Sequence, residues 1–187
     1  MTSIGARYLG IAFGGRKGNG KSLLAEYLAS VRPVRILPSK TPIVEAFELW
    51  AGHPYEKARD DQRLIRFSTE IARVENPLIV ADWLERNVPL YAAGGYLPVV
   101  PDMRFHAEND VLRRIGVFCI KVNASETTRR ARTIARDGDL RNYDPLSATE
   151  QEIDELTYDA AIDNDREDGG TYAIAQLHAV LASAGLA

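Results

Sequence analysis

Residues 15–22 of the chain read Gly-Arg-Lys-Gly-Asn-Gly-Lys-Ser, which fits the pattern G-x-x-x-x-G-K-[ST]. Its glycines permit backbone conformations that a Cβ would forbid, so that successive amide groups can converge on anionic oxygens. Lys21 would reach the β- and γ-phosphates of a nucleotide, and the hydroxyl of Ser22 would ligate Mg²⁺. The loop therefore predicts a phosphate site; a glycine-rich turn without a ligand is the alternative.

The segments on either side of this loop suit a phosphate site. The apolar run at 8–13 predicts a short buried strand. Leu23, Leu24 and Leu28 recur at helical spacing after the loop. A helix that starts near Lys21 would add the positive end of its dipole to the site. Strand, loop and helix together favour bound phosphate.

Four further apolar runs predict strands, at 34–37, 96–101, 117–122 and 160–162. The run 96–101 contains Pro98 and Pro101, which cannot donate to a sheet ladder. We retain this strand because its apolar run stops at an acidic residue, Asp102. In phosphate-loop enzymes a neighbouring strand delivers a carboxylate that helps to organise Mg²⁺. We therefore expect Asp102 and Ser22 to share the metal.

Polar residues follow the ends of these strands. Lys40 follows the run 34–37, Asp102 and Arg104 follow the run 96–101, and Asn164 follows the last run. Because ligands bind where the carboxyl ends of parallel strands open, we expect these residues on one rim with the loop.

Four arginines, at positions 129, 130, 132 and 136, fall within eight residues that contain no acid. On a helix, positions 129, 132 and 136 share one face, whereas Arg130 lies about 100° away. Ser125 can cap this helix, and the polar stretch 137–145 after it predicts a hinge. Beside a phosphate loop this segment is interpreted as an arginine lid; a solvated basic face is the alternative.

The remaining helices are predicted from caps and periodicity. They are expected at 41–50 with Thr41 as cap, at 55–75, at 76–91, at 109–115, at about 149–156 with Thr149 and Glu152 as a capping box, and at 171–184. The helices between 55 and 94 form an insertion that could hold an acceptor, although two solvent-facing helices are an equal interpretation.

Composition limits the classes of partner. The 187 residues include 23 basic and 26 acidic side chains, so the net charge of −3 gives no global attraction to nucleic acid or membrane. Cys119 lies in an apolar run and is interpreted as a buried strand thiol. One cysteine permits no internal disulfide, and no apolar run approaches 18 residues. We expect a cytoplasmic protein.

Five strands that alternate with helices imply a single α/β domain, in which a doubly wound five-stranded parallel sheet carries helices on both faces. The core is expected at about 1–54, 95–125 and 157–187, the helical insertion at 55–94 and the lid at 126–150. Phosphoryl transfer would need the donor phosphates neutralised, the acceptor oxygen aligned and water excluded. An acceptor that is itself a phosphate needs no strong general base.

Several segments together resemble the deoxynucleoside monophosphate kinases of tailed bacteriophages, within the P-loop nucleoside monophosphate kinase group. They are the loop, Asp102-x-Arg104 followed by Glu108, the arginine segment, the stretch 162–165 and the Thr-Glu helix 63–73 followed by Trp83. The resemblance implies a three-layer P-loop kinase fold and transfer of the ATP γ-phosphate, with Mg²⁺, to a (deoxy)nucleoside monophosphate. It also implies the host cytoplasm if a phage encodes the chain.

The resemblance also implies roles for individual residues. ATP and Mg²⁺ would be held by Gly15, Arg16, Lys17, Gly18, Asn19, Gly20, Lys21 and Ser22, with Asn164 near the adenine. The acceptor would be held by Lys40, Arg63, Thr69, Glu70, Trp83, Asp102, Arg104 and Glu108. Catalysis would use Lys21 and Arg104 together with Arg130, Arg132 or Arg136 from the lid.

Two departures and two alternatives remain. Many relatives have an acid where this chain has Ser22, and a His-x-Ser-Glu sequence where it reads Leu146-Ser-Ala-Thr-Glu150. The first alternative is a kinase for another small acceptor, such as a sugar or an acid. The second is a nucleotide-dependent switch, although no Asn-Lys-x-Asp motif for guanine is present. A homodimer through the helices between Tyr55 and Tyr91 is compatible with their surface.

Overall fold

The structure is a computed structural model that describes residues 8–140 and 143–186. Its five strands form one all-parallel sheet in the order β2-β3-β1-β4-β5. The strands are β1 (Gly10–Gly14), β2 (Val34–Ile36), β3 (Leu97–Met103), β4 (Val117–Asn123) and β5 (Ala160–Asp163). The predicted parallel sheet is confirmed, although neighbour order could not be read from the pattern of runs.

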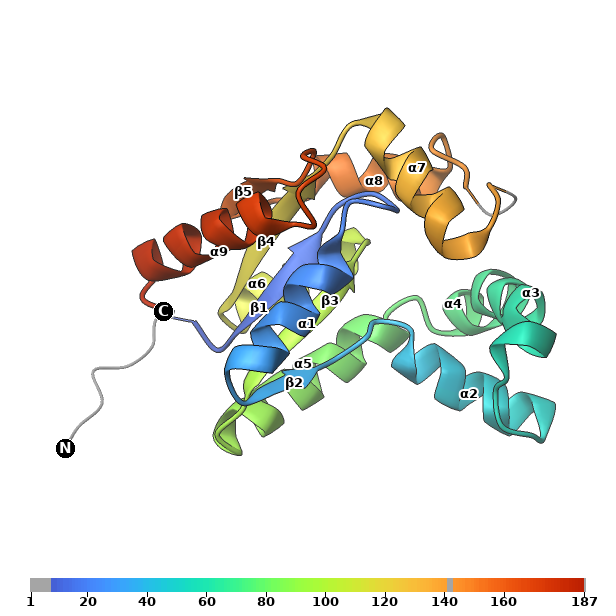
Figure 1. The fold of residues 1–187 in the computed structure, drawn as a ribbon. Coiled ribbons are helices and arrows are strands. Elements are labelled where there is room, and N and C mark those ends of the chain that lie inside the picture. Colours follow the sequence, from blue (N-terminus) through green and yellow to red (C-terminus); the bar gives the residue numbers. More distant parts are fainter. Residues whose placement is uncertain (1–7, 141–142, 187) are drawn as a thin grey trace.

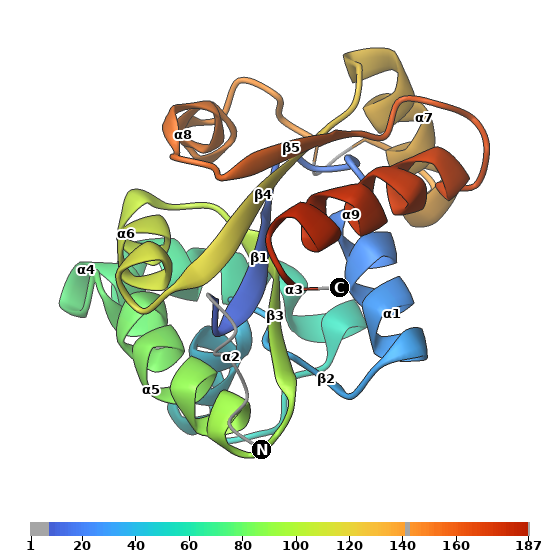
Figure 2. The same cartoon turned by 90° about the vertical axis from the view of Figure 1, so that its left-hand side faces the viewer.

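Helices cover both faces of this sheet, as Figure 2 shows. Side chains alternate along β1, so that Ile11 and Phe13 pack on α1 (Lys21–Val31) and α9 (Thr171–Ser183), whereas Ala12 faces the opposite layer. That layer contains α5 (Ile79–Ala93) and α6 (His106–Arg114). The three-layer α/β fold predicted from the sequence is therefore confirmed.

Two helical groups project beyond the carboxyl ends of the strands and face each other across that end of the sheet (Figure 1). One consists of α7 (Glu126–Asp137) and α8 (Ala148–Glu155). The other consists of α2 (Thr41–Ala51), α3 (Lys57–Phe67), the π-helical turn η1 (Ser68–Ala72) and the short α4 (Arg73–Glu75). The helices of the expected lid, and the first part of the expected insertion together with α2, thus lie on opposite sides of one rim.

The strand β3 is longer than expected and accommodates both prolines in the middle of the sheet. Pro98 precedes the register with β1, which begins at the pair Ile11–Val99. Pro101 lies beyond the register with β2, which ends at the pair Ile36–Val99, and adjoins an irregularity in the β1 register. Because each proline lies outside one ladder, its missing N–H leaves the pairing intact.

Two predicted helix caps are wrong. Lys40 is the N-cap of α2, and Thr41 is the first helical residue. Ser147, not Thr149, caps α8, because its hydroxyl accepts the backbone N–H of Glu150. The expected helix 109–115 begins three residues earlier, at His106. Ser125 caps α7 as predicted, and its side chain accepts the N–H of Thr128.

The helix α5 belongs to the sheet packing. Its residues Val80, Leu84 and Val88 are buried in the same cluster as Ala12 and Val100 of the central strands. The sequence analysis assigned this helix to the insertion. Because α5 packs on the sheet instead, we take residues 41–75 as the helical group that faces the rim at the carboxyl ends of the strands. Cys119 is buried in β4, and burial raises the pKa of its thiol to about 12, as expected for an inert strand thiol.

Candidate active site

The phosphate loop connects β1 to α1 and depends on left-handed glycines. Gly15, Gly18 and Gly20 have φ angles of 137°, 88° and 87°. A Cβ on Gly18 would lie 2.7 Å from the carbonyl oxygen of Arg129 on α7. Glycine at this position therefore serves both the turn and the close approach of the lid helix.

Lys21 is the first residue of α1 and lies folded against its own loop. Its ammonium donates to the carbonyls of Gly15 and Arg16, and its Nζ lies 3.4 Å from Oδ1 of Asp102. Burial lowers the pKa of Lys21, whereas the nearby carboxylate opposes this shift. A shielded ammonium of this kind is suited to a polyanionic ligand.

Asparagines tie the loop to the rest of the rim. The Nδ2 of Asn164, directly after β5, donates to the carbonyl of Asn19 at 2.8 Å. Asn19 in turn donates to the carbonyl of Val122 at the end of β4. Asn164 is 3% exposed and, with Arg132, lines a cavity of about 340 Å³ beside the loop. It lies where the sequence placed it, next to the phosphate loop.

A larger cavity of about 530 Å³ lies in front of the loop and contains most of the predicted donor residues. Lys17, Gly18, Gly20, Lys21 and Ser22 contribute from the loop and α1. Arg132 and Arg136 contribute from α7 on the other side. The predicted pairing of the loop with lid arginines is therefore present in the structure for these two arginines.

A second cavity of about 520 Å³ lies on the side of α3 and η1. Its charged lining residues are Lys40, Asp61, Arg73, Asp102, Arg104 and Glu108, and its apolar lining residues are Ile43, Leu64, Ile65 and Phe105. Ser39, Lys40, Asp102 and Arg104 line both large cavities. The two spaces therefore meet at the ends of β2 and β3.

Arg104 is the charged residue at this junction. Its Nε donates to Oδ2 of Asp102 at 2.7 Å, and its Nη1 lies 3.6 Å from Oε1 of Glu150. Burial of Asp102 would raise its pKa, yet Arg104 and Lys21 hold the pKa of this carboxyl below its usual range. Asp102 is thus an anion between two cations; its carboxylate suits a metal ion, whereas Lys21 and Arg104 suit phosphate.

Glu108 lies behind the second cavity and is 1% exposed. Its Oε2 accepts the backbone N–H of Arg104 at 2.9 Å, and its Oε1 lies 3.6 Å from Nη2 of Arg73. Burial raises the pKa of Glu108 to about 7, although Arg73 and the backbone amide oppose the shift. This carboxyl supports two cations that line the acceptor-side cavity.

Four residues predicted for the site have other contacts. Arg63 donates to the buried Asp60 at 3.1 Å, and Glu70 pairs with Arg66 on an exposed surface. Trp83 lies on α5 and packs against the core, and Arg130 is exposed on α7, where it lies 3.7 Å from Glu126. Among the described residues that line the two large cavities, none of these four is included.

Thr69 does line the acceptor-side cavity, but its hydroxyl already donates to the carbonyl of Ile65 at 3.0 Å. Arg16 is not among the lining residues of the donor cavity, and its Nε and Nη2 both donate to Oδ2 of Asp154 on α8, at 3.1 and 2.6 Å. Lys17 Nζ lies 3.4 Å from Asp137.

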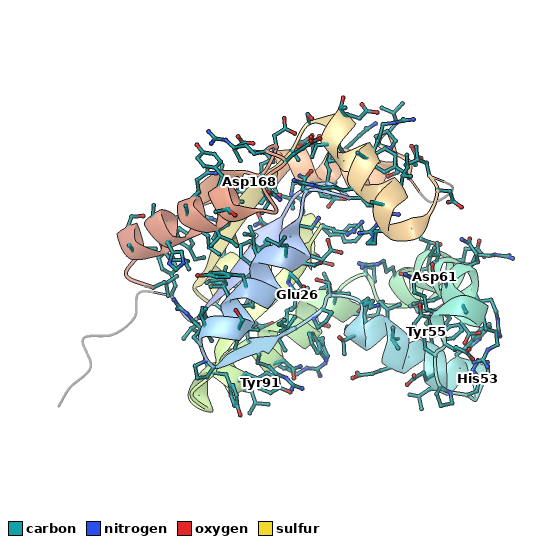
Figure 3. All side chains as sticks on the ribbon, viewed as in Figure 1. Glu26, His53, Tyr55, Asp61, Tyr91 and Asp168 are labelled. Carbon is teal, nitrogen blue, oxygen red and sulfur yellow. The ribbon has the colours of Figure 1, made fainter. Side chains whose placement is uncertain are left out.

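Sequence reasoning missed three side chains at this rim, namely Asp61, Arg73 and Glu150. Arg73 follows the π-helical turn and lines the cavity, and its guanidinium lies 4.1 Å from the centre of the Phe105 ring. The pattern of residues did not indicate this position. In Figure 3 Asp61 lies on the side of α3 that is nearer α7, and His53 lies on the far side.

The donor set at the loop fits Mg²⁺. The Oδ1 of Asp102 is shielded from solvent and, within the described part of the chain, its partner is Nζ of Lys21 at 3.4 Å. Ser22 lines the same cavity. Both residues offer the oxygen ligands that Mg²⁺ prefers. In residues 8–140 and 143–186 no group of three or more His, Cys, Asp or Glu side chains forms a protein-only metal site.

No protein-family model and no curated protein matches the chain. Solved structures are similar in fold. They include an unliganded sugar kinase from a Janibacter species, with 17% identity and a TM-score of 0.57 over 95% of this chain and 96% of that one. The APS kinase of Mycobacterium tuberculosis with AMPPNP and APS shows 15% identity and a TM-score of 0.54 over 92% and 96%.

A third structure is the shikimate kinase of Acinetobacter baumannii with shikimate, at 16% identity and a TM-score of 0.53 over 95% and 96% of the two chains. The chain therefore has the fold of these P-loop kinases over nearly its whole length.

Within the described residues, no helix combines the length and apolar character that a membrane crossing requires.

Proposed function

We propose that the protein is an ATP-dependent kinase that transfers the γ-phosphoryl group to a nucleoside or deoxynucleoside monophosphate. The observation that carries this proposal is the junction of two cavities at Lys40, Asp102 and Arg104. A donor phosphate in one space and an acceptor phosphate in the other would both meet Arg104. The similar kinases support phosphoryl transfer by this fold.

The donor side would bind ATP through the loop amides and Lys21. Asn164 and Arg132 line the smaller cavity beside the loop, which suits the adenosine part of ATP. Mg²⁺, held by Ser22 and organised by Asp102, would neutralise charge on the β- and γ-phosphates. Arg132 and Arg136 line the larger donor cavity from α7 and would stabilise the transferring phosphoryl group.

The acceptor side favours an anion with a flat apolar part. Lys40, Arg73 and Arg104 supply three cations to its lining, which also contains the three carboxyls of Asp61, Asp102 and Glu108. The guanidinium groups of Arg73 and Arg104 match the geometry of a phosphate, although each already lies near a carboxyl group. The apolar residues around Phe105 provide a surface for a base. These guanidinium groups, rather than an excess of positive charge, support a phosphate acceptor over a neutral sugar.

A panel of acceptors tests the proposal. Purified protein with ATP and Mg²⁺ should form ADP and a nucleoside diphosphate with at least one common ribo- or deoxyribonucleoside monophosphate. Shikimate, gluconate and neutral sugars should give no turnover above ATP hydrolysis. Turnover confined to such acceptors would favour the alternative kinase, and tight ATP binding without any transfer would favour a switch.

A further inference from the structure

We propose that Glu150 is a positioning residue that fixes the phosphate loop and Arg104 relative to each other. Both carboxylate oxygens of Glu150 accept the backbone N–H of Lys17, at 3.0 and 3.3 Å. Its Oε1 also lies 3.6 Å from Nη1 of Arg104. One carboxylate therefore joins the donor loop to the arginine that lines both cavities. The inference rests on the proposed function for the roles of those two groups.

Glu150 is buried near the start of α8, where contacts of this helix hold it against the phosphate loop. It is 5% exposed and lies in the first turn of α8, after the N-cap Ser147. One turn later, Asp154 contacts the guanidinium of Arg16 at 2.6 Å and Nζ of Lys121 at 2.9 Å. Two acidic residues of α8, Glu150 and Asp154, thus contact two successive loop residues, Lys17 and Arg16. These contacts keep the Glu150 carboxylate in place.

The Glu150 carboxylate contacts the phosphate loop but does not line the donor cavity. Among the described residues, Lys17 and Arg104 line the donor cavity, whereas Glu150 lines neither that cavity nor its neighbour. The Lys17 amide is therefore assigned to anchoring the loop, and the following residues are left to face phosphate. This distinguishes Glu150 from a carboxylate that merely takes the place of a phosphate.

Arg104 is orientated by two carboxylates at two different nitrogens. Asp102 contacts Nε at 2.7 Å, and Glu150 contacts Nη1 at 3.6 Å. Contacts at both positions fix the plane and the rotation of the guanidinium, which a single partner would leave free. The position of Arg104 is thereby tied to the position of the loop.

The substitution Glu150→Gln separates these two contacts. Its amide oxygen can still accept the Lys17 N–H, but its NH₂ group then faces the Arg104 guanidinium, and two donors cannot pair. We expect the KM for the acceptor to rise about tenfold and the KM for ATP to change by less than about twofold. Glu150→Ala should raise both values, because the loop amide also loses its acceptor.

The matched control is Asp154→Asn, which weakens the contact of α8 with Arg16 but does not touch Arg104. It should leave the acceptor KM within about twofold of wild type. Equal effects of Glu150→Gln and Asp154→Asn on the acceptor KM would overturn the proposal, because both would then act only through α8. So would an acceptor KM that Glu150→Gln leaves unchanged.

Amide hydrogen exchange of the ligand-free protein provides a readout that needs no activity. Exchange in the loop 15–20 should accelerate in Glu150→Ala and remain near wild type in Glu150→Gln. If wild-type protein phosphorylates no nucleoside monophosphate, the proposed function fails, and the loop contact of Glu150 is still decided here. Unchanged loop exchange in a folded Glu150→Ala protein would refute that contact.

Discussion

The donor side and the acceptor side of this rim are built in different ways. The donor loop is one continuous stretch of eight residues whose glycines have positive φ angles and whose lysine starts α1. The acceptor-side cavity is lined by side chains from several separate elements, namely α2, α3, η1, α4, β3 and α6. Backbone geometry defines the first site, whereas side-chain placement on several helices defines the second.

This difference indicates which part of the function each site controls. A loop whose backbone amides bind phosphate does not by itself select the acceptor, and the similar kinases differ in their acceptors. Under the proposed function, the acceptor side would determine the substrate through residues such as Lys40, Arg73 and Arg104. Substitutions on the donor side should therefore affect turnover with every acceptor, and those on the acceptor side should mainly affect acceptor affinity.

The largest effect is expected from Lys21→Ala. Loss of this buried cation should lower kcat by about 10²- to 10³-fold, because charge on the transferring phosphate would be left unbalanced. The fold should remain, since Lys21 contacts loop carbonyls and Asp102 and is not part of the apolar core. Steady-state kinetics and a thermal unfolding curve measure both effects. Turnover close to wild type would exclude the assigned donor site.

Arg73→Ala should have the next largest effect. Arg73 lines the acceptor-side cavity, and its removal should raise the acceptor KM about 10- to 100-fold while the ATP KM changes little. The matched control is Arg63→Ala, from the neighbouring helix α3. Arg63 supports the buried Asp60, so its loss should lower the melting temperature and leave the acceptor KM nearly unchanged.

The reverse result, with Arg63→Ala weakening acceptor binding and Arg73→Ala having no effect, would restore the pocket predicted from the sequence. Equal effects of the two variants on the acceptor KM would show that the distinction between lining and supporting arginines is wrong. Either outcome is visible in the same set of steady-state measurements with ATP held at saturation.

Glu108→Gln should change how stability depends on pH. Because burial raises the pKa of Glu108 from 4.5 to about 7, the native state favours the protonated carboxyl. Wild-type stability should fall as pH rises between these values, and the neutral variant should lack this loss. Relative to wild type, Glu108→Gln should gain on the order of 3 kcal/mol of unfolding free energy between pH 4 and pH 8. Parallel denaturation curves for both proteins that stay equally spaced would contradict this.

The smallest effect is expected from Glu70→Gln. Glu70 pairs with Arg66 at 3.5 Å, and both side chains are mostly exposed. Exposed pairs of this kind contribute about 0.2–0.5 kcal/mol, so the acceptor KM and the unfolding free energy should stay close to wild type. A tenfold rise in the acceptor KM would place Glu70 in the pocket after all.

The fold could be predicted because its signals are local. Each strand is an apolar run between helical patterns, and the loop motif lies between a strand and a helix as expected. The prolines of β3 were the weakest point, and their positions outside the two ladders were not readable without the register. The order of the strands also depends on packing between segments that are distant in the sequence.

The positions of Lys21, Ser22 and Asn164 beside the loop follow from the motif and a strand end, and their roles stay a prediction. On the acceptor side, some of the predicted residues do not line the cavity. Arg63 and Arg73 are both cations of one helical stretch, and which of the two lines the cavity depends on tertiary packing. Glu150 was missed because α8 reaches the loop through tertiary packing.

A bisubstrate analogue tests whether the two cavities form one site with Arg104 between them. Such an analogue joins adenosine to a nucleoside through five phosphates and is long enough to occupy both cavities. We expect it to compete with ATP and with the monophosphate acceptor, and we expect Arg104→Ala to weaken its binding more than that of ATP. Competition with ATP alone, unaffected by Arg104→Ala, would show that the two cavities do not act as one site.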